Sequence, residues 1–482
     1  MIQGILIQAH KNFEQLLHLV EYFTNDCYVF IHIDKKSTFK DEQISLLKEL
    51  PQVKGIYKKF SVHWAGFSIL KCELFLLKEA LKYPEIGYFH LISGQDYPIK
   101  PLNSFLDFFN ANNNKSYMEF QHIPFPQWEK NTYARYCSYF LFDYLPRTEK
   151  ARKMHLKFQS WQRKIGIKRN IPNQFDHLYG GSAWFSITRE AVSVLLNYHK
   201  HHKSFYHRLR FTFCPEETYV TTVLVNLIPK NKVIADNYRY IRWTKENGSC
   251  PANYGTEHFF LIAQHHGFFA RKFDVPVSQN CISLIDKYLL SDSPLEVTET
   301  GGWVYNGFLK YHFNYLLNNL LLEYFHRTHT TSIIDFGCGA GYYVASFRRN
   351  GFLACGYDAN PYTPELSSLI LPPNDCFCET ADLTGEIEVE EKFDVALCLD
   401  VIGYIPIGLW EKAINNLIKL SQKAIIIGLK HNSVKADASA SDVGIIKNHM
   451  SKHDFHYNES LSQVCFSSLH SYKMLIFERI LN

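Results

Sequence analysis

Two adjacent carboxylates stand at the head of a mostly apolar stretch of the sequence. They are Glu216 and Glu217, in FTFCPEETYVTTVLVN (residues 211–226), where a proline precedes them and a helix of buried type follows. Acids in a first helical turn are stabilised by the helix dipole, by about 0.3–1 kcal/mol each. A carboxylate fixed at a helix start is also well mounted to act as a general base. The residues alone leave capping and catalysis both open.

A second group, in the C-terminal half, combines acids with glycines. SIIDFGCGAGYYVASFRRNGFLACGYDANP begins as an apolar strand, turns through D-x-G-x-G-x-G and continues as a helix. Glycines allow such a turn to bend tightly and to approach a ligand closely. About twenty residues on, Asp358 ends the next strand, where an acid can accept hydrogen bonds from both ribose hydroxyls. The motif predicts a nucleoside-binding site made by Asp335, Gly337, Gly339 and Gly341, with a degenerate, cofactor-free fold as the alternative.

Further acids end predicted strands in the N-terminal half. Asp34 lies in HIDKKS and Asp96 in SGQDYP, and the second could also simply cap a turn before Tyr-Pro. No Asp-x-Asp follows a strand, so the sequence predicts no metal site of that type. Cys376 and Cys378 are spaced wrongly for a standard structural zinc site.

These residues are positioned by strands that alternate with helices. Apolar periodicity predicts strands over residues 4–10, 28–34 and 88–94 and helices over 12–23 and 67–83. Such alternation predicts an α/β fold with a parallel sheet and helices on both faces. Ligands then bind beyond the carboxyl ends of the strands.

The pattern is interrupted by a polar stretch at residues 286–302 and starts afresh after a helix at 308–325. We therefore predict a first domain over residues 1–288, a linker over 289–300 and a second domain over 301–482.

Composition limits the class of protein. The 482 residues are 46% hydrophobic with a net charge of +4, which is typical of folded domains and gives no nucleic-acid signature. The 12 cysteines are dispersed and suit core positions in a reducing compartment. The sequence predicts no signal peptide and no transmembrane helix, hence a soluble cytoplasmic protein. For the basic stretch 152–170, a solvated face is favoured over contact with anionic lipid, so we expect at most peripheral membrane contact.

The N-terminal half resembles the family of core-2/I-branching β-1,6-N-acetylglucosaminyltransferases and peptide O-xylosyltransferases. Seven segments match in family order: IHIDKKS, SVHWAGFSILKCELFLLKEAL, YFHLISGQDYPIK, YGGSAWFSITRE, CPEETYVTTVL, RYIRW and FFARKFD. The resemblance implies a GT-A type nucleotide-sugar-binding domain, a UDP-sugar donor carrying a sugar of the N-acetylglucosamine or xylose type, inversion at the anomeric carbon, and no metal.

The same resemblance implies roles for single residues. Glu217 takes the place of the catalytic base, and Glu216 orients the site or contacts the acceptor. Asp34, Asp96, Arg271 and Lys272 are implied to bind the donor. Arg242 is implied to take the place of the second basic residue that the branching enzymes have at the diphosphate. Trp184 and Trp243 are implied to stack on acceptor sugars. Lys272 as a surface lysine, and both tryptophans as core residues, are the alternatives.

The C-terminal half resembles the class I S-adenosylmethionine-dependent methyltransferases, with a Rossmann-like fold. The resemblance implies that Asp335, Gly337, Gly339 and Gly341 surround the methionine part and that Asp358 binds the ribose. Asp382, in ADLT, is implied to face the adenine. Asp400, in FDVALCLDVIGYIP, lies with Val401 at the open end of the fourth strand. His431 and Tyr404 are candidate groups at the methyl acceptor.

Together these features predict a bifunctional enzyme that glycosylates a glycan or lipid-linked oligosaccharide and methylates the same glycan. Its start directly on a strand suits a bacterial enzyme of surface polysaccharide synthesis working in the cytoplasm, possibly at the inner face of the membrane. Two alternatives stay open: a C-terminal half that only binds or scaffolds, and an N-terminal half that only binds glycan. The sequence does not name the donor sugar, the acceptor or the oligomeric state, and it implies no nucleic-acid partner.

Overall fold

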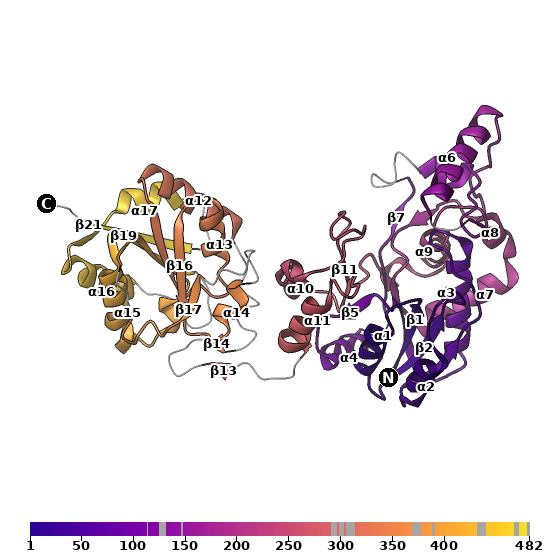
Figure 1. The fold of residues 1–482 in the computed structure, drawn as a ribbon, viewed down its shortest axis with the longest axis horizontal. Helices are drawn as coiled ribbons and strands as arrows, with labels where there is room; N and C mark the ends of the chain where they lie inside the picture. The colour runs from indigo at the N-terminus through magenta and orange to yellow at the C-terminus, as the bar shows by residue number, and fades with distance from the viewer. Residues whose placement is uncertain are drawn as a thin grey trace. The chain divides into compact units, whose positions relative to one another are not determined.

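The computed structural model describes most of the chain, except residues 113, 125–131, 146–147, 291–295, 298–302, 305–313, 369–376, 388–390, 431–439, 467–471 and 480–482. It forms two compact units, residues 1–290 and 291–482 (Figure 1). The predicted linker falls largely outside the described residues. In the part of the chain that is described, no helix has both the length and the apolar run needed to cross a bilayer.

A seven-stranded sheet forms the centre of the first unit. Its strands are β1 (Ile2–Ala9), β2 (Cys27–Ile33), β3 (Val53–Tyr57), β4 (Ile86–Ser93), β6 (Ser116–Met118), β9 (Phe185–Thr188) and β10 (Val233–Ile234). Their spatial order is β10-β6-β9-β4-β1-β2-β3. Strands β3, β2, β1 and β4 run parallel, as predicted, whereas β9 is antiparallel to both β4 and β6.

The sheet is therefore mixed, and the expectation of a wholly parallel sheet is wrong at this edge. A long excursion separates β6 from β9, and the chain re-enters the sheet at the end where β6 leaves it, so no crossover to the opposite end is needed.

Helices cover both faces of this sheet (Figure 1). On one face pack α1 (Phe13–Glu21), α2 (Asp41–Glu49) and α4 (Leu102–Ala111). On the other pack α3 (Phe67–Ala80), α7 (Arg189–His201), α8 (Lys203–Arg208) and α9 (Glu216–Leu227). Each interface is a continuous apolar core, because Leu, Ile and Phe recur at helical spacing on the inward faces. The predicted helices at 12–23 and 67–83 are confirmed as α1 and α3.

Smaller elements complete the first unit. A three-stranded sheet, ordered β11-β12-β5, consists of β5 (Asp96–Pro98), β11 (Arg239–Ile241) and β12 (Phe269–Arg271). The remaining elements are β7 (Gln121–His122), α5 (Thr132–Cys137), α6 (Glu149–Lys164), β8 (Tyr179–Gly180), α10 (Phe259–Gln264) and α11 (Gln279–Ile285).

The second unit also has a seven-stranded sheet, ordered β17-β16-β15-β18-β19-β21-β20. Its strands are β15 (Ser332–Phe336), β16 (Leu353–Asp358), β17 (Cys378–Thr380), β18 (Phe393–Leu399), β19 (Ser421–Lys430), β20 (Phe455–Tyr457) and β21 (Tyr472–Arg479). The first five are parallel, and β21 is antiparallel to β19 and β20. The strand order reverses between β15 and β18, which is where α/β sheets bind ligands.

Helices lie on both sides of this second sheet as well. They are α12 (Tyr315–Arg327), α13 (Tyr342–Arg349) and α17 (Glu459–Phe466) on one side, and α15 (Trp410–Leu420) and α16 (Ala440–Ser451) on the other. The short helix α14 (Thr363–Ser368) follows β16. The predicted strands that carry Asp335 and Asp358 are confirmed as β15 and β16.

Candidate functional sites

The two carboxylates that begin α9 have different surroundings. The side chain of Glu216 is 5% exposed, and its Oε2 has no hydrogen-bond partner among the described residues. The side chain of Glu217 is 20% exposed, and its Oε2 lies 2.8 Å from a guanidinium nitrogen of Arg135. Only the second acid is therefore both reachable and paired with a cation.

A third acid, Glu73 of α3, is buried beside this pair, and its Oε2 also has no hydrogen-bond partner in the described part of the chain. Burial and the charges of Glu216 and Glu217 raise the pKa of Glu73 far above its usual range. Burial and the neighbouring Glu217 raise the pKa of Glu216 to about 8. Burial also raises the pKa of Glu217, but Arg135 opposes that rise. Arg135 therefore makes Glu217 the acid of the three that is best placed to carry a negative charge, whereas burial shifts Glu216 and Glu73 toward their protonated forms.

Cys214 completes this cluster, because its Sγ and oxygens of Glu216 and Glu217 lie within 4.8 Å of one another. Three such groups could surround a metal ion. However, burial raises the pKa of the Cys214 thiol well above its usual range, and Glu217 is already bound to Arg135. A metal needs deprotonated ligands, so this arrangement fits a proton-holding cluster better than a metal centre.

An aromatic cluster lies next to Arg135. The guanidinium of Arg135 is 4.9 Å from the ring of Phe213, and Phe213 contacts the rings of Trp64 and Phe142 at 5.7 and 5.4 Å. Trp64 is 52% exposed. A ring with an exposed face near a carboxylate is suited to contact the apolar face of a sugar.

The residues assigned to the donor gather at the edge of the small sheet. Arg271 of β12 pairs in register with Asp96 of β5, and its guanidinium nitrogen is 2.6 Å from Asp96 Oδ1. The same guanidinium stacks 4.5 Å above the ring of Trp184. The loop before Trp184 reaches α9, since the Gly181 N–H donates to the Glu217 carbonyl oxygen at 3.1 Å. The segment from Gly181 to Trp184 therefore contacts both Arg271 and the backbone at the start of α9.

Lys272 and Arg242 follow the paired parallel strands β12 and β11. The Lys272 Nζ donates to Ser249 Oγ at 2.9 Å. The Arg242 Nε donates to Glu246 Oε1 at 2.9 Å, and hydrogen bonds from His258 and Arg242 help lower the pKa of Glu246 to about 2. Arg242 is thus committed to Glu246. The next residue, Trp243, is 61% exposed.

Asp34 follows β2 at the carboxyl end of the large sheet. Its carboxylate accepts from the backbone N–H groups of Lys36 and Val62, at 2.8 and 3.2 Å. His10 directly follows β1, and desolvation together with the charges of Lys11, Arg271 and Lys272 lowers its pKa, against the opposing charge of Asp34. His10 is therefore within electrostatic range of residues from both predicted donor groups.

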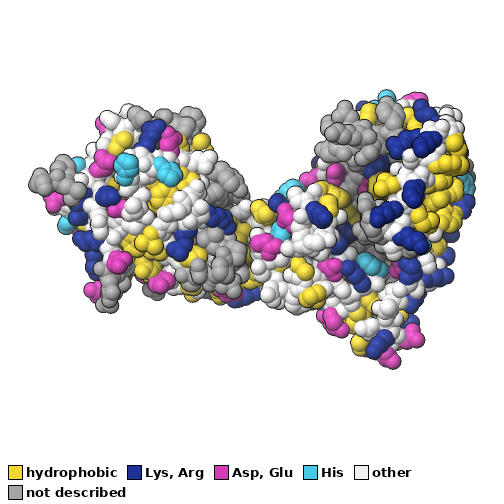
Figure 2. Space-filling view, turned by 45° about the horizontal axis from the view of Figure 1, so that its top comes forward, with side chains coloured by type: hydrophobic (Ala, Val, Ile, Leu, Met, Phe, Trp, Pro, Cys, Tyr) yellow, Lys and Arg dark blue, Asp and Glu magenta, His cyan; other side chains and the backbone are white. Residues whose placement is uncertain are grey.

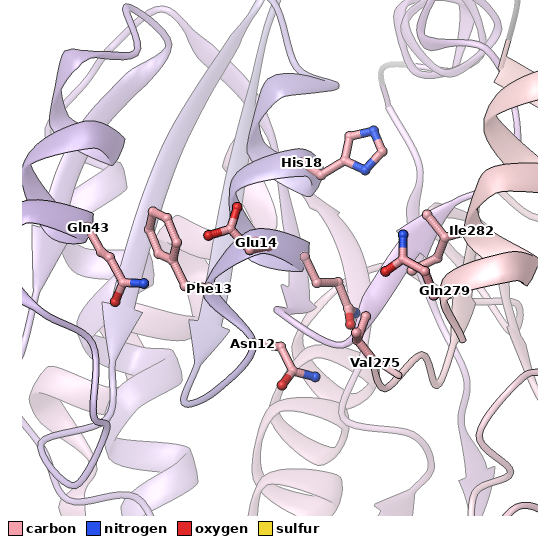
Figure 3. Close-up of a pocket in the computed structure, with 9 residues that line it drawn as sticks. Asn12, Phe13, Glu14, His18, Gln43, Val275, Gln279 and Ile282 are labelled. Carbon is pink, nitrogen blue, oxygen red and sulfur yellow. The ribbon is translucent and has the colours of Figure 1, made fainter. Parts of the chain in front are cut away.

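A pocket of about 350 Å³ lies close to this edge, between α1 and α11 (Figure 3). It is lined by Asn12, Phe13, Glu14, Gln15, His18, Gln43, Val275, Gln279 and Ile282. The Asn12 amide donates to Asp274 Oδ1 at 2.7 Å. None of the residues predicted to be functional lines this pocket.

The glycine turn of the second unit joins β15 to α13. Gly337, Gly339 and Gly341 have φ angles of +77°, +57° and +83°. A Cβ on Gly337 would lie 2.1 Å from Val401 Cγ2, whereas a Cβ on Gly339 would meet nothing within 4 Å. The turn therefore needs glycine at the first position for packing, and at the second it borders open space.

Acids frame this open space. Asp358 Oδ2 accepts from the Gly339 N–H at 2.8 Å, and Oδ1 accepts from the Asn360 N–H at 2.9 Å. A carboxylate has about four acceptor positions, so both oxygens can still accept ribose hydroxyls. Asp335 is 2% exposed, its Oδ1 has no partner within the described ranges, and burial together with Asp358 raises its pKa to about 8. An orphaned buried acid beside a glycine turn fits a cationic, nucleoside-bearing cofactor.

The other predicted residues of this unit are less directly engaged. Asp382 follows β17, is exposed, and accepts from the backbone and hydroxyl of Thr384. Asp400 follows β18 with a φ of +58° and raises the pKa of Tyr404, although burial contributes more. His431 lies outside the described residues.

Four side chains in the first site, Glu73, Arg135, Trp64 and His10, were missed by the sequence analysis. Glu73 had a signal: it occupies an inward position of α3 between Leu70 and Leu77, where an acid is rarely buried without a function. Arg135 had none, because it lies 82 residues from Glu217 in the sequence.

Each unit thus has the architecture of a transferase that binds a nucleotide-bearing donor at the carboxyl ends of parallel strands. Residues 5–263 match the model of the Core-2/I-Branching enzyme family, and residues 305–465 match a Methyltransferase domain model. The first match covers more than half of the chain, which therefore belongs to the Core-2/I-Branching enzyme family. The second half is an S-adenosylmethionine-dependent methyltransferase domain.

Curated relatives of the first half include Xylosyltransferase 2 from Rattus norvegicus, 23% identical over 309 residues, which are 60% of this chain and 33% of the relative. Human Xylosyltransferase 2 is 23% identical over 316 residues, 61% of this chain and 34% of the relative. This chain thus spans about a third of the length of these relatives.

Solved structures similar to the second half include magnesium protoporphyrin IX methyltransferase from Synechocystis PCC 6803 with bound SAH. It has a TM-score of 0.26 and 15% identity, over 35% of this chain and 90% of that one. A SAM-bound amino pentose methyltransferase from Micromonospora echinaspora has a TM-score of 0.28 and 9% identity, over 34% and 90%. The assignment of this half depends on the family model and on its own strand order instead.

Proposed function

We propose that the first unit is a GT-A type glycosyltransferase that moves a sugar from a UDP-sugar to a glycan hydroxyl with inversion and without a metal ion. The observation that carries this proposal is the Glu217–Arg135 pair, a reachable carboxylate 2.8 Å from a guanidinium and next to two acids that burial shifts toward their protonated forms. A carboxylate whose pKa is raised by burial is a stronger general base than one in water.

In this reaction the acceptor oxygen bonds to the anomeric carbon of the donor, and the bond from that carbon to the diphosphate oxygen breaks. The acceptor proton goes to Glu217. Burial favours the protonated forms of Glu216 and Glu73, which leaves Glu217, beside Arg135, as the group that takes the proton. Arg135 keeps that charge stable between turnovers.

The departing diphosphate carries negative charge that must be stabilised. Arg271 and Lys272 stand at the end of β12, beside the end of β11, and because Arg271 is already paired with Asp96 we assign the diphosphate to Lys272 in the first place. Asp34, fixed by two backbone N–H groups at the end of β2, is suited to bind the uridine. Trp184, stacked under Arg271 in a loop that reaches α9, is suited to lie against a sugar.

For the second unit we propose methyl transfer from S-adenosylmethionine to a hydroxyl of the same glycan. S-adenosylmethionine, when bound, supplies a strongly electrophilic methyl group, so this chain must chiefly bind and align. Asp358 would hold the ribose, the turn at Gly339 would border the methionine part, and Asp335 would face its positive charge.

A screen of UDP-sugars with the full-length chain tests the first proposal. We expect UDP release from one or a few of the sugars, unchanged by excess EDTA, detected by mass spectrometry. Lys272→Ala should weaken binding of UDP more than binding of uridine, because the cation serves the diphosphate; Lys232→Ala, whose Nζ binds Glu190, is the matched control. Loss of UDP release in EDTA with recovery in Mn²⁺ would refute the metal-free mechanism.

A further inference from the structure

One surface of the first unit exposes apolar and basic side chains together. It consists of α6 and the segment after it, residues 149–171, called here the α6 surface. Thr148 caps α6 through a hydrogen bond from the Ala151 N–H at 3.2 Å. The helix is fixed to the body by the buried side chains of His155, which stacks 4.4 Å from Phe142, and Gln162, which exchanges two hydrogen bonds with the backbone of Tyr139. One face of the helix is thus held in place, and another is left outside.

The outer side carries large apolar residues. Six of them have an exposed fraction between 38% and 52%: Met154, Leu156, Trp161, Ile165, Ile167 and Ile171. Nineteen large hydrophobic side chains are exposed in the described part of the chain, so six within 23 residues is a marked concentration. Met154, Trp161 and Ile165 lie within about 40° of one another around the helix axis. These three form a continuous apolar strip beside the buried face, whereas Leu156 lies about 160° around the helix from them and Ile167 and Ile171 follow the helix.

A strip of lysines runs along the other side of the apolar strip. Lys153, Lys157 and Lys164 also fall within about 40° of one another, centred about 80° from the apolar strip. Residues 149–171 contain eight Lys or Arg and one Glu, a net charge of +7, against +4 for the whole chain, so the rest of the chain is net negative by three. Figure 2 shows dark blue and yellow side chains close together on the first unit.

We propose that the α6 surface docks on the anionic face of a phospholipid bilayer. Apart from Trp161, the exposed apolar side chains have no aromatic ring to stack on bases, which argues against nucleic acid, but all of them can partition into the acyl boundary. Lysines beside them attract anionic headgroups and extend toward the interface along their own aliphatic stems. A merely solvated basic face, favoured by the sequence, does not account for an exposed strip of Met, Trp and Ile along the lysines.

Two successive aromatic rings, Phe142 and Phe213, connect the α6 surface with the residues around Glu217. Phe142 stacks on His155 of α6 and also contacts Phe213, which lies under the guanidinium of Arg135, the partner of Glu217. Docking through α6 would therefore bring the acceptor side of the site close to the membrane. A glycan attached to a lipid carrier is the acceptor that such a placement favours.

Vesicle sedimentation of the full-length chain tests the proposal. We expect binding to vesicles that contain phosphatidylglycerol, little binding to phosphatidylcholine alone, and a steep loss of binding with added salt. Changing Lys153, Lys157 and Lys164 to Gln should weaken binding by about fivefold for each lysine. Trp161→Ser with Met154→Ser should weaken it further at every salt concentration.

Matched controls lie on other surfaces. Changing the exposed Lys40, Lys48 and Lys54 to Gln should leave vesicle binding unchanged, as should Ile407→Ser, whose side chain is 62% exposed. UDP release in solution should be the same in all variants, since none of these side chains belongs to the site. The proposal is overturned by absence of binding to phosphatidylglycerol vesicles, by equal losses in the control variants, or by lysine-dependent binding to a DNA duplex without binding to vesicles.

Discussion

The head of α9 and the glycine turn after β15 both contain a buried acid with a pKa raised to about 8, but they are built in different ways. Glu216 lies among side chains from three separate segments, which contribute Glu73, Arg135 and Glu217. Asp335 lies in β15, directly before a turn that has positive φ angles and a backbone N–H that donates to Asp358. In the proposed functions the first arrangement receives a proton, and the second holds a ligand.

The strongest test of this contrast is removal of the base. Glu217→Gln should lower sugar transfer by about 10²–10⁴-fold, because the acceptor hydroxyl loses its proton acceptor. Transfer is measured with saturating donor, and UDP affinity is measured separately. Wild-type UDP affinity is expected, since no donor cation is altered.

Glu216→Gln is the control for that variant. Gln resembles a protonated Glu in shape and charge, so transfer should fall far less than in Glu217→Gln. If the two variants are equally inactive, the difference that we infer between the two acids is wrong.

In each unit the buried acid should make the free energy of unfolding depend on pH, and in the same direction in both units. Each unfolded acid loses its proton near its ordinary pKa, whereas the folded acid retains it up to about pH 8. The free energy of unfolding should therefore fall with rising pH between about 5 and 8, by at most about 1.4 kcal/mol per unit for each acid. Below that window the full stability is present.

Thermal unfolding across this pH range checks the prediction. Glu216→Gln should flatten the pH dependence of the transition of the first unit, and Asp335→Asn that of the second. A variant that steepens either slope would contradict the assigned protonation state.

Binding in the second unit should depend on Asp358. Asp358→Ala should weaken S-adenosylmethionine binding by about 1–3 kcal/mol, because ribose hydroxyls lose a charged acceptor. Titration calorimetry measures this, with Asp394→Ala as a control, because the Asp394 carboxylate, at the start of β18, accepts from Thr331 and not at the glycine turn. Sugar transfer should be unchanged in both variants, and its loss in Asp358→Ala would show that the two activities depend on each other.

The smallest expected effect comes from one added methyl group. Gly339→Ala places a Cβ in open space at a φ of +57°, and should cost about 1–2 kcal/mol of stability. Gly351→Ala should cost a similar amount, since its φ is +88° and its Cβ would also meet nothing within 4 Å. Only Gly339→Ala should weaken S-adenosylmethionine binding as well. Equal affinities in the two variants would place the ligand elsewhere.

The same contrast explains what the sequence could predict. The turn at Gly337 and the acid Asp358 are separated by one strand and one helix, so their spacing alone brings them together. The pairing of Glu217 with Arg135, and the packing of Glu73 beside them, depend on how distant segments fold over the sheet. No local pattern around Arg135 indicates that outcome.

The fold was predictable to a similar degree. Strands β1, β2 and β4 and helices α1 and α3 follow from apolar periodicity, and so do β15 and β16. The antiparallel entry of β9 does not, because strand direction is decided by the path of the long segment that precedes it. The residues at the small sheet were expected near the donor, but their register, with Arg271 opposite Asp96, is a tertiary feature.

The hydrogen bond from Lys272 to Ser249 lies next to a cysteine that can carry a fluorescent label for following donor binding. Cys250 follows Ser249 directly and is the exposed cysteine among those that the structure describes, the others there being buried or half-buried. A thiol-reactive fluorophore would therefore attach preferentially at that position over the other described thiols. When a diphosphate draws Lys272 away from Ser249, the dye's surroundings change, and its emission reports donor occupancy in real time before any acceptor is known.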